Sequence, residues 1–305
     1  MMQSILNKGC AVLLLVALFA ATARASDWER SVALYNKGDY QAALAEFQDL
    51  IAERPDAAGA WYYIGLCEYK LKRYDHVETP MARAIDLFEV QSPTSAEIAG
   101  AWYTIGISHY LAARYDKAIE PLKRYIELNT QAKREVEPAA RTALGRAYYQ
   151  LERFDEAEAM FAVGGKATSA EKSQDAGVNY YYLGAIYYKR EDDDRAIAAL
   201  REAVKASVEE TAAMDLLAES LLRKARKTNA NGLWLEAAEV GEKLRAVRDD
   251  EKTASVLGRA YFGARQFDKA VAPLERLAKA NADNGQAWLF YGIALSRNGQ
   301  MRKAM

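Results

Sequence analysis

The sequence contains very few of the residues that bind metals or form disulfide bridges. Its 305 residues include only two cysteines, Cys10 and Cys67, and two histidines, His76 and His109. A zinc site or a disulfide framework needs several such residues at fixed spacing, so neither is expected. The formal net charge is only -1. Because nucleic-acid binding depends on a basic surface, a nucleic-acid partner is not expected either.

Motifs typical of nucleotide-binding and hydrolytic enzymes are also missing. The sequence contains no GxxxxGK[ST], GxGxxG, GxSxG or HExxH segment. His109 takes a position that tyrosine fills in related segments, which predicts helix packing, and His76 is expected at the surface. Cys67 is expected to be a small buried side chain. The acidic run 191–194 lacks the ligand spacing of a calcium loop. We therefore predict no catalytic residue, no cofactor and no metal.

The segment 1–25 has the features of a secretory signal peptide. Lys8 precedes an apolar run over 11–21, and mostly small residues follow over 22–26. The run is too short to span a membrane, which takes about 20 apolar residues. Cys10 lies before the run, whereas a lipidated cysteine would follow it. We predict cleavage after Ala25 and an exported protein, with the bacterial periplasm as its location.

Beyond position 26 the chain repeats itself. A glycine that follows a large apolar residue recurs at intervals of 41, 39, 39, 74 and 34 positions, at Gly65, Gly106, Gly145, Gly184, Gly258 and Gly292. The longest interval holds two periods, so a degenerate unit lies after Gly184. Apolar residues within the units recur at three- and four-residue spacing, which indicates helices. Periods of roughly 20 to 50 residues are typical of solenoids.

The units resemble the tetratricopeptide repeat (TPR) family, in which each repeat is a pair of helices. The first-helix motif W-x2-L-G-x2-Y is approximated at 61–65, 102–106 and 180–184, and the second-helix motif A-x3-F is matched at 43–47 and 157–161. The resemblance covers essentially all of 27–305. It implies an all-α, right-handed superhelical solenoid of antiparallel helix pairs. The predicted division is a signal peptide (1–25) and a TPR solenoid (26–305) with repeats at about 27–57, 58–98, 99–137, 138–176, 177–208, 209–249 (degenerate), 251–284 and 285–305 (incomplete).

Recurring residues within the units predict local structure. The glycine allows the two helices of a unit to approach closely, and a larger side chain there would overpack the contact. An aspartate recurs where the second helix begins and is expected to cap it, at Asp75, Asp116, Asp155, Asp194 and Asp268. Prolines that recur inside the second helix are expected to bend it, at Pro80, Pro121 and Pro273.

Irregular segments are expected where the units depart from the family pattern. Three units are longer than the family repeat of about 34 residues and lack its terminal proline. This predicts longer second helices and loops around 89–98, 129–138 and 163–178. The degenerate sixth unit contains a polar stretch over 228–232. We expect a widened turn there and an irregular geometry or hinge.

The resemblance implies a concave binding face built from the first helices. The two positions per unit that usually face it are mostly tyrosine in units one to five, at Tyr35, Tyr62, Tyr69, Tyr103, Tyr110, Tyr149, Tyr181 and Tyr188. Packing between repeats and recognition of a partner both explain these tyrosines, and one ring can serve both. In the last units Leu289 and Ser296 take these positions, which limits the predicted aromatic groove to units one to five. A protein or peptide partner is predicted, with a glycan polymer as the alternative.

The eighth unit stops in the first turn of its second helix. Because each repeat buries its apolar face on the next, this predicts an exposed edge around Trp288. Either the natural chain continues past Met305, or this edge docks on a partner or a second copy. Together these features predict a non-enzymatic scaffold or adaptor of the cell envelope. The alternatives are a module that guides or exports a polysaccharide, and the N-terminal recognition arm of a larger protein.

Overall fold

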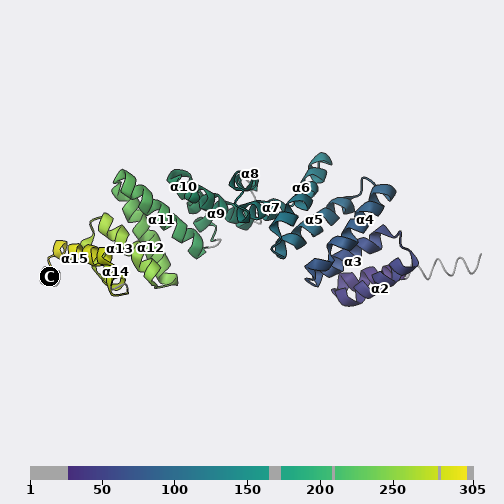
Figure 1. Cartoon of the computed structure of the whole chain (residues 1–305), viewed down its shortest axis with the longest axis horizontal. Helices are drawn as coiled ribbons and strands as arrows, with labels where there is room; N and C mark the ends of the chain where they lie inside the picture. Colours follow the sequence, from purple (N-terminus) through teal and green to yellow (C-terminus); the bar gives the residue numbers. More distant parts are fainter. Residues whose placement is uncertain (1–26, 165–172, 208–209, 281–282, 301–305) are drawn as a thin grey trace, which may run out of the picture. The chain divides into compact units, whose positions relative to one another are not determined.

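The computed structural model describes residues 27–164, 173–207, 210–280 and 283–300 (Figure 1). Every regular element within these ranges is a helix, and on each side of Leu151 consecutive helices pack against one another. The predicted all-α array of helix pairs is therefore confirmed. The predicted signal peptide, 1–25, lies outside the described residues.

The chain divides into two compact parts, with the boundary after Leu151. We refer to them as the N-terminal half and the C-terminal half. The N-terminal half begins with a helical segment over 27–37. It continues with α2 (Tyr40–Glu53), α3 (Ala58–Lys70), the short 3-10 helix η1 (Tyr74–His76), α4 (Glu78–Gln91), α5 (Ala96–Leu111), α6 (Tyr115–Gln131) and α7 (Pro138–Gln150).

The C-terminal half contains eight of the described helices. They are α8 (Phe154–Gly164), α9 (Ser173–Lys189), α10 (Asp193–Lys205), α11 (Glu210–Thr228), α12 (Asn231–Val247), α13 (Glu251–Gly263), α14 (Phe267–Ala280) and α15 (Gly285–Arg297). First helices of successive repeats also contact one another: α3 with α5 and α5 with α7 in one half, α9 with α11 and α11 with α13 in the other. The first helices therefore form one face of each half.

The recurring glycine lies where the two helices of a repeat are closest. A Cβ atom added to Gly65 would lie 2.6 Å from Cγ of Met81, and one added to Gly106 would lie 2.7 Å from Cγ of Leu122. The same contact, always to the residue 16 positions later, joins Gly184 to Leu200 and Gly258 to Leu274. These partner side chains are buried. A larger side chain cannot enter this contact unless its neighbour moves, as predicted.

The expected aspartate caps are wrong. The second helices begin one residue or more before the recurring acids, which therefore lie within the first turn, and Asp75 lies in η1. The residue that caps a helix directly precedes its first turn, so these acids do not hold the capping position. The capping side chains that accept a backbone amide are instead Asp39, Asp192, Asp250 and Asn284.

Several of the recurring acids form ion pairs between repeats instead. Asp75 pairs with Arg114, Asp155 with Arg190, and Asp194 with Lys224. Each pair joins the start of one second helix to the first helix, or the turn after it, in the next repeat. The acids are exposed, so each pair contributes at most about 1 kcal/mol to stability. Their regular spacing favours one register between neighbouring repeats.

The three prolines are not equivalent. Pro121 and Pro273 lie inside α6 and α14, where each removes a backbone hydrogen bond, as expected. Pro80 is the third residue of α4. Amides in a first turn have no acceptor within the helix, so proline is tolerated there. The separate turn η1 precedes α4, so Pro80 lies in the first turn of its helix, whereas Pro121 and Pro273 lie deeper in theirs.

The sixth repeat is more regular than predicted. Only Asn229 and Ala230 separate α11 from α12, so the widened turn expected over 228–232 is absent. Asn229 has a φ of 54°, and asparagine adopts this left-handed conformation more readily than most residues. The expected loops at 89–98 and 129–138 are also shorter than predicted, because the helices leave only 92–95 and 132–137 outside them. Of the third expected loop, 165–172 lies outside the described residues, and α9 already begins at Ser173.

Candidate functional site

The eight tyrosines predicted to face a groove are all half-buried. The first five of them, Tyr35 to Tyr110, pack on rings of neighbouring elements. Tyr35 meets Tyr63 edge to face with ring centroids 5.1 Å apart, and Tyr103 lies 5.0 Å from Tyr125. Burial raises the pKa of Tyr35 to about 12. It also raises the pKa values of Tyr62 and Tyr69, which belong to the same helix, α3. These rings therefore contribute to packing between helices.

Several of these rings contact the next repeat. The Tyr62 hydroxyl lies so close to Gly100 of α5 that a Cβ there would be 2.6 Å away. The guanidinium of Arg146 lies 5.5 Å from the Tyr110 ring centre. Tyr69 instead packs within its own repeat, with its ring centroid 6.1 Å from that of Tyr74 in η1.

In the C-terminal half the pattern is similar. Tyr181 packs on Tyr182 at 5.1 Å, and the guanidinium of Arg223 lies 4.4 Å from the Tyr188 ring centre. Tyr149, at the end of α7 in the other half, is half-buried as well. Each of the eight rings keeps part of its surface accessible, so the structure is compatible with both packing and recognition.

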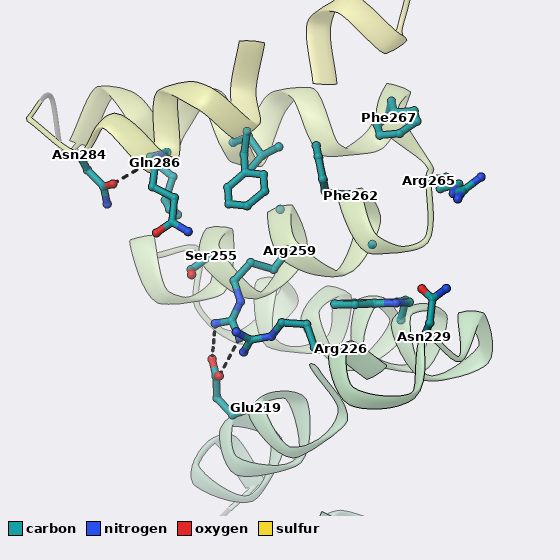
Figure 2. Close-up of a pocket in the computed structure, with 17 residues that line it drawn as sticks. Glu219, Arg226, Asn229, Ser255, Arg259, Phe262, Arg265, Phe267, Asn284 and Gln286 are labelled. Atoms are coloured by element: carbon teal, nitrogen blue, oxygen red, sulfur yellow. Dashed lines mark hydrogen bonds and ion pairs between the residues drawn. The ribbon is translucent and has the colours of Figure 1, made fainter. Parts of the chain in front are cut away.

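A cavity of about 840 Å³ lies in the C-terminal half, among α11, α12, α13, α14 and α15 (Figure 2). None of the eight tyrosines lines it. The lining residues are Glu219, Arg226, Asn229, Trp234, Ser255, Gly258, Arg259, Phe262, Gly263, Arg265, Phe267, Leu274, Leu277, Asn284, Gln286, Ala287 and Phe290. An aromatic cavity therefore exists in repeats six to eight, beyond the region where an aromatic groove was expected.

Aromatic rings form one wall of this cavity. Phe262 meets Phe267 and Phe290 edge to face, with centroids 5.6 and 4.9 Å away. The Trp234 indole lies directly on Gly263, where any Cβ atom would overlap its ring atoms. All four rings are half-buried. Gly263 thus makes room for an indole that connects α12 to the end of α13.

Charged side chains also line the cavity. Both terminal guanidinium nitrogens of Arg259 donate to the Glu219 carboxylate, at 2.9 and 3.0 Å. Figure 2 shows Arg226 extending toward the same carboxylate, but it forms no ion pair or hydrogen bond with any residue that the structure describes. Arg265, which is exposed just after α13, also forms no ion pair or hydrogen bond with any described residue. Because Arg259 neutralises Glu219, these two arginines give the cavity a positive charge.

Amide side chains complete the lining. Asn284 caps α15 by accepting from the backbone amide of Ala287 at 3.2 Å. The side-chain amides of Asn229 and Gln286 lie on exposed residues and are not hydrogen-bonded to any described group. They are therefore available to a ligand. An aromatic wall, a positive side and free amides suit a ligand that is part apolar and part anionic.

The sequence reasoning missed this cavity because it rests on the degenerate repeat. Counted from the recurring glycine, the two groove positions of the sixth repeat are Ala218 and Ala225, where the fifth repeat has Tyr181 and Tyr188. Both alanines are fully buried in α11. The residues that directly follow them, at 219 and 226, line the cavity. The loss of two tyrosines in an otherwise aromatic series was the available sequence signal.

His109 and Cys67 are buried, and His76 is exposed, as the sequence predicts. His109 is buried, with Nδ1 accepting from Nε of Arg114 at 3.1 Å and Nε2 lying 3.3 Å from Glu78. Burial lowers the pKa of His109. Cys67 is fully buried, and burial raises the pKa of its thiol to about 12. His76 is exposed. A thiol with this pKa is not a nucleophile near neutral pH.

Two further properties concern the described part of the chain as a whole. No group of three or more metal-ligating side chains occurs in it. No helix in it has the length and apolar composition that crossing a membrane requires. At its far end α15 exposes Trp288 (42%) and Leu289 (60%), as predicted for the last repeat.

Comparisons with known proteins agree on the fold. A family model described as tetratricopeptide repeat matches residues 29–76, 103–170 and 256–305, more than half of the chain, and a second model with the same description matches 179–206. The search of curated proteins found no match. Among solved structures, the C-terminal part of a TPR repeat-containing protein from Cytophaga hutchinsonii is 13% identical with a TM-score of 0.60, covering 86% of this chain and 98% of that one. Pseudomonas aeruginosa pilF is 13% identical with a TM-score of 0.50, covering 78% and 96%.

Proposed function

Since this chain belongs to the tetratricopeptide repeat family, we propose that it is a non-enzymatic scaffold that binds a polypeptide partner along its first helices. Proteins of this family typically mediate protein–protein interactions. The observation that carries the proposal is the cavity of the C-terminal half, where aromatic rings and polar groups converge on one surface. Such cavities are the usual places where proteins bind their ligands. The first helices of other repeats carry half-buried tyrosines whose surface is partly accessible.

Site-specific crosslinking tests this function. A photoreactive phenylalanine analogue at Phe262 would report on the cavity, and the same analogue at Val90 of α4, which is 84% exposed, would serve as the control. We expect irradiation of cells that make the full chain to yield a defined polypeptide adduct from position 262 and none from position 90. No adduct at 262, or the same adducts at both positions, would contradict the proposal.

The location proposed for this scaffold is the cell envelope. It is supported by the pattern of the segment 1–25: Lys8, a short apolar run and mostly small residues before Ser26. The intact mass of the protein from its natural source tests it directly. A chain beginning at Ser26 and recovered with periplasmic proteins is expected. A chain that keeps its first residues and stays in the cytoplasm would refute the export. A mass beyond that of a chain ending at Met305 would indicate the recognition arm of a larger protein.

A polysaccharide-guiding role is the second candidate, because sugars stack on aromatic faces and the eight tyrosines keep part of their rings accessible. It predicts that oligosaccharides change tyrosine fluorescence or amide shifts. Replacing Tyr62, Tyr69, Tyr103 and Tyr110 by alanine should abolish the change. No response across a broad panel of glycans would eliminate this candidate.

A further inference from the structure

We infer that the cavity of the C-terminal half recognises an internal polypeptide segment in which an aromatic or large apolar side chain lies next to acidic residues. The inference rests on the proposed function and adds the chemistry of the partner. It also selects one place on the chain, among α11 to α15, for the contact. Three properties of the lining carry it: its charge, its aromatic wall and its free amides.

The charge of the lining favours an anionic ligand. Three arginines and one glutamate are the charged residues that line it, and the glutamate is neutralised by Arg259 through two hydrogen bonds. Arg226 and Arg265 have no carboxylate partner among the described residues. Elsewhere in the C-terminal half, arginines at or near the ends of first helices are paired, such as Arg190 with Glu158 and Arg223 with Asp193. A carboxylate of a partner would give Arg226 or Arg265 the same kind of interaction.

The aromatic wall favours a ring or a large apolar side chain beside that carboxylate. Phe262, Phe267 and Phe290 already form an edge-to-face cluster, and their rings are only partly covered. A further ring joins such a cluster in the same geometry and removes apolar surface from water. Trp234 is half-buried, and its indole is held in place by its contact with Gly263. Rigid rings contribute contact area at a low entropic cost.

The free amides favour a peptide backbone over a compact small molecule. Asn229 and Gln286 each provide a donor and an acceptor, which matches the N–H and C=O groups of an extended segment. Asn229 directly follows α11 and Gln286 lies in α15, so a segment bonded to both would cross the cavity. Its volume of about 840 Å³ holds several residues. The proposal assigns the anionic groups to aspartate or glutamate side chains of the segment, and a peptide with both ends blocked tests this.

A displayed peptide library tests the inference with the full chain as bait. We expect the enriched peptides to combine phenylalanine, tyrosine, tryptophan or leucine with aspartate or glutamate close by. The best peptide is then synthesised with both ends blocked and titrated by fluorescence anisotropy. Replacing its aromatic residue by alanine, or its acids by lysine, should each weaken binding about ten-fold. Added salt should weaken it further, because the pairs are exposed.

Charge reversal in the protein gives the decisive comparison. The double variant Arg226→Glu with Arg265→Glu should bind the acidic peptide at least about ten-fold more weakly, and it should prefer the peptide whose acids are replaced by lysine. Both arginines are exposed, so this variant is expected to fold. Arg83→Glu, at an exposed arginine of α4 with no ion pair in the described residues, is the matched control and should leave the affinity unchanged.

The possible results separate this inference from the proposed function. Enrichment of peptides without acids, an unchanged affinity in the double variant, or no enrichment would each overturn the inference. If position 262 still crosslinks to a polypeptide in cells, the scaffold function stands and only the partner chemistry is wrong. If position 262 yields no adduct, the function itself fails.

Discussion

The close contact between Gly184 of α9 and Leu200 of α10 makes a quantitative prediction. A Cβ atom on Gly184 would collide with the Leu200 side chain, which is fully buried. Overpacking a buried contact costs about 1–3 kcal/mol. Alanine is more favourable than glycine inside a helix by about 1 kcal/mol, which offsets part of this cost. We therefore expect Gly184→Ala to lower the free energy of unfolding by about 1 kcal/mol.

The effect of Gly184→Ala on stability should change sign when Leu200 is replaced by alanine. Leu200→Ala alone should cost about 2–5 kcal/mol, because it leaves a cavity at a fully buried position. In that background the methyl group added at Gly184 no longer collides and fills part of the space. Only the helix preference of alanine then remains, so Gly184→Ala should stabilise the Leu200→Ala variant by about 1 kcal/mol. The coupling between the two substitutions is then about 2 kcal/mol.

The assay is urea unfolding of all four members of the cycle, followed by circular dichroism and by hydrogen exchange of the α9 and α10 amides. Exchange reports on these two helices even where a repeat array does not unfold in one step. The control is Gly232→Ala in α12, where a Cβ would meet nothing within 4 Å. It should be neutral or stabilising in both backgrounds. Additive effects of Gly184→Ala and Leu200→Ala would refute the reasoning.

Three further predictions follow from buried or capping groups. Burial lowers the pKa of His109 below its ordinary value of 6.5, so the unfolded chain binds a proton more readily than the folded chain. The free energy of unfolding therefore falls as the pH drops below 6.5. His109→Gln should reduce this loss of stability, measured by urea titrations between about pH 7 and pH 5. The Cys67 thiol, with a pKa of about 12, should react with iodoacetamide at about pH 8 only after unfolding, and rapid modification found at Cys67 by peptide mass in the native chain would contradict its burial. Asp250 accepts from the amide of Thr253 at 2.8 Å, so Asp250→Ala should cost about 1 kcal/mol in the same urea assay, more than Asp268→Ala, which removes an acid that lies inside the first turn of α14.

Much of the architecture follows from the spacing of a few residues. The recurring glycine has a meaning that a single sequence can reveal, because close approach of two helices requires a small side chain at a fixed place in the repeat. The structure adds the partner of the glycine, a large buried residue 16 positions later, such as Met81 for Gly65. Periodicity therefore predicts the helix pairs well, since every unit must bury the same face.

The ends of the helices were harder to predict. The acids that recur most often are the natural candidates for caps, but the residue before each of them already begins the helix. Counting back from Tyr40 and from Asp193, the first residues of α2 and α10, gives the true caps, Asp39 and Asp192. In a sister repeat this position holds Arg114, which pairs with Asp75 of the preceding repeat. The residue before the second helix thus caps the helix in some repeats and forms an ion pair with the preceding repeat in another. The spacing of the repeats alone cannot distinguish these two roles.

The cavity escaped prediction for a related reason. A repeat that keeps the family pattern fills its groove positions with rings that pack on the next repeat, as Tyr62 does against α5. The sixth repeat has Ala218 and Ala225 there, and the residues beside them open onto the cavity. Because this repeat departs from the family pattern, its fold is harder to predict from the sequence. Its helices are nevertheless regular, since core leucines such as Leu221 and Leu222 are fully buried. A repeat that retains its core while losing its groove residues is therefore a better candidate for recognition than its more typical neighbours.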